Sequence, residues 1–388
     1  MSLRVAYILA RPVGVSETFI DCEVRALRLA GARVDVFPAL VGGRRAAAIL
    51  FLAALARRPL RLARHARALR YGRRGWLAAA AAIHLAPIVA RARPDVVHAH
   101  FVNLPTAVAV LLGDDLGLPV TATAHAADFR LDRDSPALRR RLNRLDHLFV
   151  ISADTARQLG DRGVPLNRVP YRVVRAAFDG IVLPPLPART LPPTGPARLV
   201  TVARLIGKKG IDTAVEAVAR LVAAGRDVAY DVYGDGPLGP ALRQVVADRG
   251  LAARITFHGA VPHATALAAL AGADVAVLPC RADANGDLDG IPVFLMEAAG
   301  RRVPVVTTAV SGIPELVDES GGWLVPPGDP EALALAIGQV LDAPQQAARR
   351  STALAERVAD EFSPAVQAGR LMTTWSGITR ARPAGAPR

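Results

Sequence analysis

The chain has 388 residues, of which 52% are hydrophobic and 21% are charged. That length suggests two domains, and the composition excludes an intrinsically disordered chain. The two cysteines, Cys22 and Cys280, exclude a disulfide scaffold and a structural zinc cluster, and they favour a reducing cytoplasm. The apolar run at the start of the chain is too short for a secretory signal.

The positive charge is confined to the first half of the chain. Residues 1–180 contain 28 basic and 14 acidic residues, whereas residues 181–388 contain 20 of each. Residues 36–94 contain twelve arginines and no Asp or Glu. All basic residues are arginines except the adjacent Lys208 and Lys209, which marks a position that requires an ammonium group.

The first half predicts alternating strands and helices. Apolar runs predict strands, and segments with helical periodicity predict helices. Buried strands separated by helices are typical of a parallel, doubly wound sheet. The expected strands are 3–9, 33–40, 95–101, 119–125 and 147–152, and the expected helices are 17–30, about 44–92, 104–116 and 135–145.

A proline-rich segment separates this pattern from a second one like it. Residues 183–197 contain six prolines and cannot form a regular element, so they are expected to be a linker. Two doubly wound domains bind ligands at the carboxyl ends of their strands, and a cleft between them is the expected site. The expected parts are an acceptor-side domain (1–182), the linker (183–197), a nucleotide-sugar-binding domain (198–345) and a helical tail (346–388).

The longest charge-free stretches do not predict a membrane span. Residues 46–56 and 77–90 are both shorter than the ~18 residues that cross a bilayer, and the second contains His84 and Pro87.

The second half carries the motifs that point to phosphate chemistry. Arg204 ends a predicted strand, and Lys209 stands just before a predicted helix. Two cations backed by a helix N-terminus suit a diphosphate, and a solvated surface loop is the alternative. Gly234 and Gly236 follow another strand, where a tight turn or a close approach of the backbone to a nucleotide would explain them.

Two further segments carry carboxylates, and one of them also has a glycine whose backbone is expected to be accessible. Asp289 precedes a helix that contains Glu297, and Pro292 suits the first turn of that helix. A carboxylate can hold a ribose diol, and a salt bridge on the helix face is the alternative for Glu297. Gly312 is expected to free the backbone so that amides face an anion, and Glu315 could be a cap or a ligand group.

The ordered segments ARLIGKKG, VYGDGP, DGIPVFLMEAAG and PVVTTAVSGIPELV resemble the nucleotide-sugar half of the retaining GT-B glycosyltransferases of family 4. The segments SETFIDCEVRAL, DVVHAHF and TATAHAADF resemble the bacterial exopolysaccharide branch of that family, of the colanic-acid type. The resemblance covers roughly residues 3–345. It implies two Rossmann-like domains that face each other across a cleft.

The resemblance also implies roles for individual residues. Arg204 and Lys209 would bind the donor diphosphate, Glu297 the ribose, and Asp289 would lie near the transferred sugar. His125 would lie beside the sugar, with Asp128 supporting its loop. The implied catalytic residues are His125, Asp289, Arg204 and Lys209; the remaining donor-binding residues are Gly234, Gly236, Gly290, Ile291, Pro292, Glu297, Gly312 and Ile313; and the acceptor-side residues are Glu17, His100 and Asp128.

The sequence departs from the family pattern at three places. Asp289 stands where the wider family usually has Glu, although Asp before Gly-Ile-Pro is familiar in this branch. The segment 13–15 replaces a glycine pair of many relatives, and 172–179 lacks the glycine that usually follows its strand. Donor contacts from that last segment are therefore in doubt.

No metal or other cofactor is expected. His98 and His100 share one face of a strand, but the sequence offers no third ligand beside them. Asp287 and Asp289 spell the D-x-D of metal-dependent glycosyltransferases of another fold, in the wrong domain context. Glu17 follows Ser16 at a helix start, so it could cap the helix or face the acceptor.

The predicted function is transfer of a sugar, with retention, from a UDP- or GDP-sugar to a glycan or lipid-linked acceptor in bacterial surface or exopolysaccharide synthesis. The alternatives are a nucleotide-sugar epimerase or hydrolase on the same fold and a non-catalytic nucleotide-sugar-binding protein. The basic surface argues against the former, and the intact motif residues argue against the latter. Nucleic acid is not an expected partner, because no recognition motif accompanies the arginines.

An anionic membrane surface is an expected partner of the acid-free segment. Arg57, Arg58, Arg61 and Arg64 would spread over one face of a helix, with Leu55, Leu62, Ala66 and Leu69 opposite them. A solvated helix that covers the sheet is the alternative. The expected location is the cytoplasm, peripheral on the inner face of the membrane.

Overall fold

A computed structural model describes residues 2–11, 18–40, 43–69, 72–125, 128–129, 135–176 and 195–381. The chain forms two compact units. The N-terminal unit comprises Met1–Ala177 and Pro364–Arg388, and the C-terminal unit comprises Phe178–Ser363. The expected linker lies outside the described residues up to 194. The expected tail is divided between the units, because α14 (Pro344–Phe362) belongs to the C-terminal unit and α15 (Pro364–Ala381) to the N-terminal unit.

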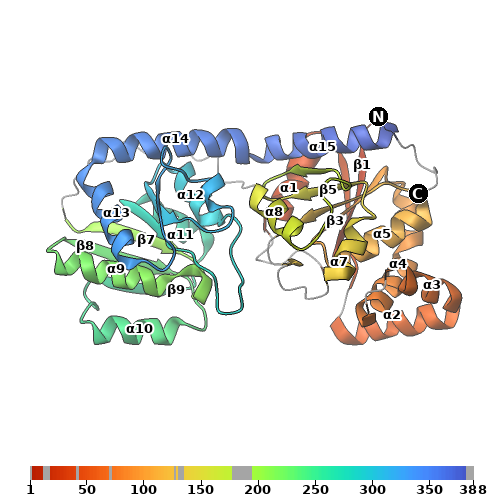
Figure 1. Cartoon of the computed structure of the whole chain (residues 1–388), viewed down its shortest axis with the longest axis horizontal. Helices are drawn as coiled ribbons and strands as arrows, with labels where there is room; N and C mark the ends of the chain where they lie inside the picture. Colours follow the sequence, from red (N-terminus) through yellow and green to blue (C-terminus); the bar gives the residue numbers. More distant parts are fainter. Residues whose placement is uncertain are drawn as a thin grey trace. The chain divides into compact units, whose positions relative to one another are not determined.

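The N-terminal unit is built on a six-stranded parallel sheet with the strand order β2-β1-β3-β4-β5-β6 (Figure 1). Buried residues fill the strands at the centre of the sheet, as expected for strands covered on both faces. The strands are β1 (Arg4–Leu9), β2 (Arg33–Pro38), β3 (Val96–His100), β4 (Val120–Ala124), β5 (His147–Val150) and β6 (Tyr171–Val173).

Alternation along β1 divides the core of this unit into two layers. Ala6 and Ile8 pack with α4 and α5 on one face, and Tyr7 packs with α1 and α15 on the other. The side chain of Trp375, from α15, is fully buried in this second layer. The helices of the unit are α1 (Thr18–Leu29), α2 (Gly43–Arg57), α3 (Pro59–Leu69), α4 (Gly72–Ala92), α5 (Leu104–Leu116), α7 (Ser135–Leu142), α8 (Ala153–Asp161) and α15.

The arginine-rich segment forms three helices rather than one long helix. Pro59 begins α3, because proline suits a first helical turn and cannot continue the preceding helix. Arg57 and Arg61 therefore lie on different helices, so the expected single arginine face is wrong. Leu62 and Ala66 are buried in the core of the protein, as in the alternative of a helix that covers the sheet, whereas Leu55 is 45% exposed.

One helix is longer and more apolar than the sequence suggested. The stretch Arg74–Ala92 within α4 has 19 residues and meets the length and composition of a membrane span. Half of it is buried inside the protein, and the alanines at positions 78–82 and Ala86 belong to the core on one face of the sheet. A buried core helix passes the same test, and α4 is packed as one.

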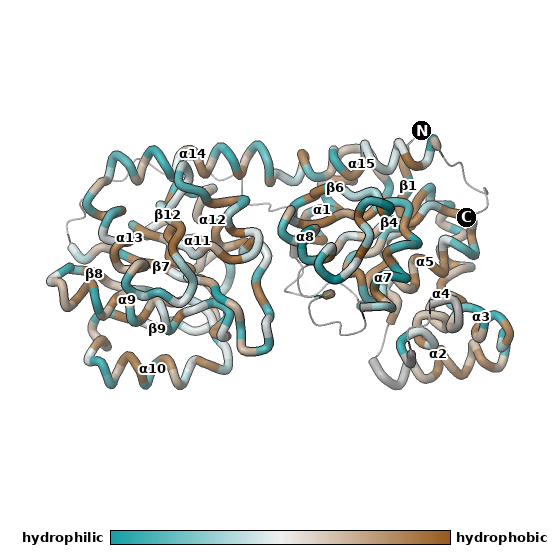
Figure 2. The backbone as a smooth tube through the Cα atoms, in the orientation of Figure 1, coloured by the Kyte–Doolittle hydropathy of each residue, from teal (hydrophilic) through white to brown (hydrophobic). Residues whose placement is uncertain are grey.

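The C-terminal unit repeats the architecture with the strand order β12-β11-β10-β7-β8-β9, all parallel. Helices α9 and α13 contribute to the core on one face of this sheet, and α11, α12 and α14 to the core on the other. Figure 2 shows hydrophobic residues along the central strand β7 and mostly hydrophilic ones along the outer helix α14. The two doubly wound sheets confirm the expected fold class.

The bounds of the elements in the C-terminal unit fix where the motif residues lie. The strands are β7 (Ala197–Val202), β8 (Val228–Tyr233), β9 (Ile255–Gly259), β10 (Val275–Leu278), β11 (Val305–Thr308) and β12 (Trp323–Val325). The helices are α9 (Ile211–Ala223), α10 (Gly239–Asp248), α11 (His263–Ala271), α12 (Val293–Gly300), α13 (Pro330–Asp342) and α14. Single 3-10 turns, η2 (Gly207–Lys209) and η3 (Ile313–Glu315), follow β7 and β11.

Candidate functional site

The motif residues of the C-terminal unit gather at one edge of its sheet. Each motif follows the carboxyl end of β7, β8, β10 or β11, and these four strands are neighbours in the sheet. Parallel strands bring their carboxyl ends to the same edge, where doubly wound sheets bind their ligands. The topology therefore brings together Arg204, Lys209, Gly234, Asp289 and Gly312.

The two lysines of the chain form a cluster with the two aspartates of the D-x-D segment. Lys208 Nζ lies 2.8 Å from Asp287 Oδ2 and 3.4 Å from Asp289 Oδ1. Lys209 Nζ lies 2.7 Å from Asp289 Oδ2. All four side chains are about 15% exposed, so the pairs are largely shielded from water. We call these four residues the lysine–aspartate cluster.

The cluster favours the charged forms of Asp289 and Lys208. Burial opposes ionisation of Asp289, but Lys209 and Lys208 outweigh it and lower the pKa of its carboxyl below the usual value. Burial likewise opposes the charge on Lys208, but Asp289 and Asp287 outweigh it and raise the pKa of its ammonium. The same carboxylate adds to burial in raising the pKa of the Cys280 thiol to about 12, so this thiol stays neutral.

Arg204 contributes a cation that has no ion-pair partner in the described part of the chain. Its side chain is exposed, and its guanidinium has no partner among the described residues. Lys208 and Lys209 at the same edge are paired with Asp287 and Asp289, and Arg281 beside them is paired with Asp212. Arg204 is thus a cation of this edge that is exposed to an incoming anion.

The glycines of the G-D-G segment are required by close backbone packing. A Cβ on Gly234 would lie 1.9 Å from the carbonyl oxygen of Ala203, and one on Gly236 would lie 2.5 Å from that of Leu205. The backbone of Gly234 also has a φ of 128°, which favours glycine. The segment packs directly on the loop that carries Arg204, so these glycines position that loop.

Glu297 lies inside α12, as expected, but it already has a partner. Its Oε1 lies 2.7 Å from Nε2 of His263, the first residue of α11. The side chain of Glu297 is 9% exposed and that of His263 is 66% exposed. A ligand hydroxyl could therefore reach Glu297 by replacing the imidazole, which can turn into solvent.

Three expectations about local backbone need correction or detail. Pro292 precedes α12 as its N-cap in extended conformation, so the first-turn placement is wrong. Gly312 has an ordinary φ of −82°, and its neighbour Ser311 takes the left-handed conformation at 52°. The side chain of Ile313 is fully buried in the core, so only its backbone can face a ligand. Gly290 and Ile291 lie beside the cluster in the loop before α12.

In the N-terminal unit, Asp128 joins the ends of two neighbouring strands. Its Oδ2 accepts hydrogen bonds from the backbone N–H groups of Val102 (2.6 Å) and His125 (3.2 Å). Its Oδ1 is buried without a partner among the described residues. Burial outweighs the backbone hydrogen bonds and raises the pKa of Asp128 to about 7. This geometry supports the loop of His125.

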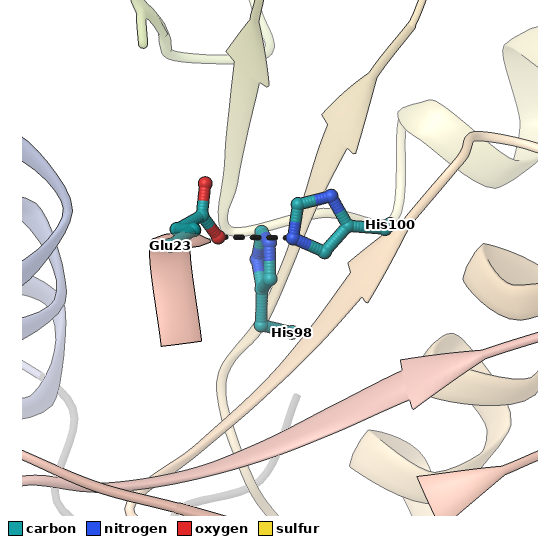
Figure 3. A group of neighbouring side chains, drawn as sticks. All are labelled: Glu23, His98 and His100. Atoms are coloured by element: carbon teal, nitrogen blue, oxygen red, sulfur yellow. Dashed lines mark hydrogen bonds and ion pairs between the residues drawn. The ribbon is translucent and has the colours of Figure 1, made fainter. Parts of the chain in front are cut away.

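A chain of buried polar groups leads from the core to His125. Tyr7 Oη donates to Glu23 Oε1 (2.5 Å), His100 Nε2 lies 2.9 Å from the same oxygen, and His100 Nδ1 lies 3.1 Å from His125 Nε2. Figure 3 shows Glu23, on α1, facing the His100 ring from β3. None of the four side chains is more than about 8% exposed.

Glu23, His98 and His100 also meet the distance requirement of a metal site. Their ligand atoms lie within 4.8 Å of one another, so the expectation that a third ligand is missing is wrong. Hydrogen bonds already engage both ring nitrogens of His98, which lie 2.9 Å from Thr121 Oγ1 and 3.2 Å from Thr123 Oγ1. Trp375 Nε1 donates to the same Thr121 hydroxyl at 3.0 Å. We interpret the group as a hydrogen-bond network.

Sequence reasoning missed Glu23, Tyr7 and His263. Glu23 could have been found, because it lies on the apolar face of α1 between Ile20 and Leu27. Glu17 lies outside the described residues, so its expected role stays a prediction. The sequence singled out Lys208 as one of two adjacent lysines, but it did not predict the ion pair between Lys208 and Asp287.

The comparisons with known proteins match both units. Residues 16–179 match the model of Glycosyltransferase Family 4, and residues 196–343 match that of Glycosyl transferases group 1. This chain belongs to glycosyltransferase family 4. Its membership confirms the resemblance that the motifs carried.

Two of the similar curated proteins are named for the synthesis of bacterial polysaccharides. The chain is 33% identical over 286 residues to the colanic acid biosynthesis glycosyltransferase WcaL of Escherichia coli, over 72% of this chain and 66% of WcaL. It is 41% identical over 140 residues to the amylovoran biosynthesis glycosyltransferase AmsK of Erwinia amylovora, over 36% of this chain and 34% of AmsK. The matches thus span from about one third to just under two thirds of these relatives.

Solved structures agree with the fold. Anabaena HepE in complex with UDP superposes with a TM-score of 0.70 at 16% identity, over 97% of this chain and 100% of HepE. The sucrose-phosphate synthase of Thermosynechococcus elongatus superposes with a TM-score of 0.70 at 20% identity, over 98% of this chain and 100% of its own. At these identities the likeness establishes the GT-B fold.

The raised pKa of Asp128 predicts how stability changes with pH. The folded protein holds this proton up to about pH 7, whereas an unfolded Asp loses it near pH 4, so wild type loses stability as pH rises between these values. Asn at this position does not titrate. Asp128→Asn should therefore gain thermal stability relative to wild type as pH rises from about 4 to about 7, measured by scanning calorimetry. A difference in Tm that is constant with pH would contradict the burial of an uncompensated carboxylate.

Proposed function

We propose that this chain transfers a sugar, with retention, from a nucleoside-diphosphate sugar to a glycan or lipid-linked acceptor in surface or exopolysaccharide synthesis. The observation that carries the proposal is the lysine–aspartate cluster with the exposed Arg204 at one strand edge. Family membership and the names of WcaL and AmsK support the activity and the pathway. The structures of HepE in complex with UDP and with UDP-glucose support a UDP-sugar as the donor.

The donor diphosphate is proposed to bind Arg204 and Lys209. Charge builds on the departing phosphate as the glycosidic bond breaks, and fixed cations stabilise it without reorganisation. No metal cofactor is needed in this proposal. The paired ammonium groups beside Asp287 and Asp289 disfavour a divalent cation there, because like charges repel at these distances.

Retention is proposed to follow a same-face displacement. Asp289, the carboxylate that the family motif places nearest the sugar, is held between two lysines, which reduces its nucleophilicity. The C-terminal unit would bind the donor, with Glu297 on the ribose. The N-terminal unit would bind the acceptor, with His125, His100 and Glu17 on that side.

The decisive experiment tests donor binding and transfer together. UDP-, GDP- and ADP-sugars are incubated with the purified protein, and thermal stabilisation and product formation are followed with and without a glycan acceptor. Transfer that requires an acceptor supports the proposal. An isomerised sugar or acceptor-independent hydrolysis would favour the epimerase or hydrolase, and binding without any product would favour a non-catalytic protein.

Lys209→Ala should weaken binding of the free nucleoside diphosphate by roughly 1.5–3 kcal/mol, because a charge-assisted hydrogen bond is lost. The measurement is isothermal calorimetry. The control is Arg254→Ala, which also removes an ion-paired cation, from the opposite end of the strands. Unchanged affinity in Lys209→Ala would remove the diphosphate assignment.

Asp289 and Glu297 should act on different steps. Glu297→Gln should weaken the binding of free nucleotide, because the variant loses contacts to the ribose. Asp289→Asn should leave nucleotide affinity nearly intact and lower turnover with the full donor. Calorimetry and initial rates separate the two effects. Equal weakening of free nucleotide by both variants would disprove this division, and activity lost to EDTA and restored by Mn²⁺ would favour a metal at Asp287 and Asp289.

We further propose that the N-terminal unit docks on an anionic membrane surface, on the inner face of the cytoplasmic membrane. Ile49, Leu52 and Leu55 are exposed apolar side chains on α2, and Leu60 on α3 is 87% exposed. A pocket of about 460 Å³ between α2, α3 and α4 has apolar walls and is lined by Arg57 and Arg58, among other residues.

Fewer arginines are available to bind anionic lipid than the sequence indicated. Asp115 pairs with Arg61 and His65, so Arg61 is engaged inside the protein, and Asp115 Oδ1 also lies 3.9 Å from the guanidinium of the more exposed Arg64. Arg57, Arg58 and Arg64 are exposed, and each arginine near an anionic surface contributes about 1 kcal/mol. Apolar side chains beside cations bind the membrane interface without spanning it.

Vesicle co-sedimentation tests the docking surface. Wild type should bind anionic vesicles at low salt and be released at high salt, and Arg57, Arg58 and Arg64 changed together to Gln should bind much less. The matched control changes Arg220 and Arg349, two exposed arginines of the C-terminal unit. Equal sedimentation of the triple variant and wild type, or equal binding to neutral vesicles, would exclude the proposed surface.

A further inference from the structure

The contacts around Glu23 and the neighbouring histidines determine where each proton lies. Tyr7 is a donor to Glu23 Oε1, because burial, and next the Glu23 charge, raise the pKa of its hydroxyl well above the usual value. A carboxylate only accepts, so the His100 nitrogen that faces the same oxygen, Nε2, must carry a proton.

The next hydrogen bond follows from this one. When His100 is neutral and protonated on Nε2, its Nδ1 holds a lone pair. His125 Nε2 lies 3.1 Å from that Nδ1, so it must carry the proton that fills the bond. Burial, and then His100, lower the pKa of His125 well below its usual value, so His125 is neutral. Its Nδ1 is left with a lone pair and has no partner within the described segments.

We propose that Glu23 and His100 form a proton relay behind His125, which fixes the ring proton of His125 on Nε2 and takes over a proton that arrives at His125 Nδ1. Glu23 and His100 are positioning residues in this relay, and His125 is the residue that meets a hydroxyl. The assignment rests on the proposed function only in naming that hydroxyl as one of the sugar donor or the acceptor.

The protons and charges of the step balance. A hydroxyl O–H bond breaks and an N–H bond forms at His125 Nδ1. The His125 Nε2–H bond then breaks and a bond forms at His100 Nδ1. His125 ends neutral with its proton on Nδ1, and the positive charge lies on His100, 2.9 Å from the carboxylate of Glu23. The hydroxyl oxygen keeps the electron pair of the broken O–H bond. It can then act as a nucleophile, or a hydrogen-bond donor can stabilise its negative charge.

The surroundings favour this path for the charge. The groups that face His100 are Tyr7 from β1, Glu23 from α1, His98 on its own strand and His125 after β4. Burial, and next His100 and His125, lower the pKa of His98 well below its usual value, so His98 stays neutral. Among these groups only Glu23 offers a negative charge.

Aromatic rings hold His125 in place at the end of the relay. The centroid of Phe101 lies 4.7 Å from that of His125, and the centroid of Phe19 lies 5.0 Å from it. Phe101 has a φ of 73°, a strained conformation for a residue with a side chain. Phe101 directly follows His100 in the chain, and its strained backbone turns its ring toward His125.

Histidine NMR of the ligand-free protein tests the relay without any assay of transfer. At about pH 8, ¹⁵N-edited spectra should show both His100 and His125 as the Nε2–H tautomer. A His125 that carries its proton on Nδ1 beside a neutral His100 would overturn the proposal. So would one tightly bound equivalent of zinc, whose removal by a chelator changes the spectra of His98 and His100.

Glu23→Gln tests the charge. The amide oxygen can still accept from Tyr7 and His100, so the fold and the resting tautomers are kept, but the anion that stabilises a charged His100 is lost. We expect kcat to fall about 10-fold or more, with the donor KM within about twofold of wild type. Glu23→Asp, which restores the charge, should recover part of kcat.

Asp154→Asn is the matched control, because it changes another buried carboxylate of the same unit to its amide, outside the relay. It should leave kcat unchanged. If Glu23→Gln retains full kcat, the relay is wrong. The relay is also wrong if kcat falls only in variants whose NMR spectra show that the unit has unfolded. Absence of any glycosyl transfer by wild type would instead refute the proposed function, and the NMR result would still stand.

Discussion

Polar groups that leave water must find partners inside the protein, and this requirement shapes both strand edges that carry the motif residues. In the C-terminal unit it brings Lys208 and Lys209 onto Asp287 and Asp289. In the N-terminal unit it joins Glu23 to His100 at a distance of 2.9 Å. Removing one member of either group would leave a buried charge or donor unpaired, which costs more than the pair itself contributes. The positions of the candidate residues therefore depend on one another.

Much of the architecture could be predicted, because it depends on local patterns. Apolar runs such as 95–101 became strands, and the six-stranded sheets follow from strands alternating with helices. The motifs around Arg204 and Asp289 were found because their residue types and order are specific, and the parallel topology then brings them to one edge. The function class followed from the same motifs, and membership of family 4 confirms the resemblance.

The rest depends on contacts between residues that are distant in the sequence. Nothing near Trp375 indicates that α15 returns to the N-terminal unit, where its indole donates to Thr121 across 254 positions. His263 reaches Glu297 from another helix, and Glu23 reaches His100 from another element, so neither partner has a local signal. Pro59 is a local signal that ends the preceding helix, but the prediction relied on the absence of acidic residues and placed the arginines on one helix.

The two units solve the same problem of burial with opposite chemistry. The edge of the C-terminal unit uses full charges, with Lys208 and Lys209 paired to Asp287 and Asp289, and with Arg204 exposed beside them, where a diphosphate can reach it. The edge of the N-terminal unit uses imidazoles with the carboxylate of Glu23 behind them, so it can take up one proton and hold the resulting charge beside that carboxylate. Fixed charge suits a departing phosphate, and mobile protons suit a hydroxyl that must lose its hydrogen. A sugar transferase needs both, and no single buried cluster could provide them, because the fields of charged lysines would suppress protonation of nearby imidazoles. Dividing the two tasks between two sheets is thus a physical reason for a two-unit fold.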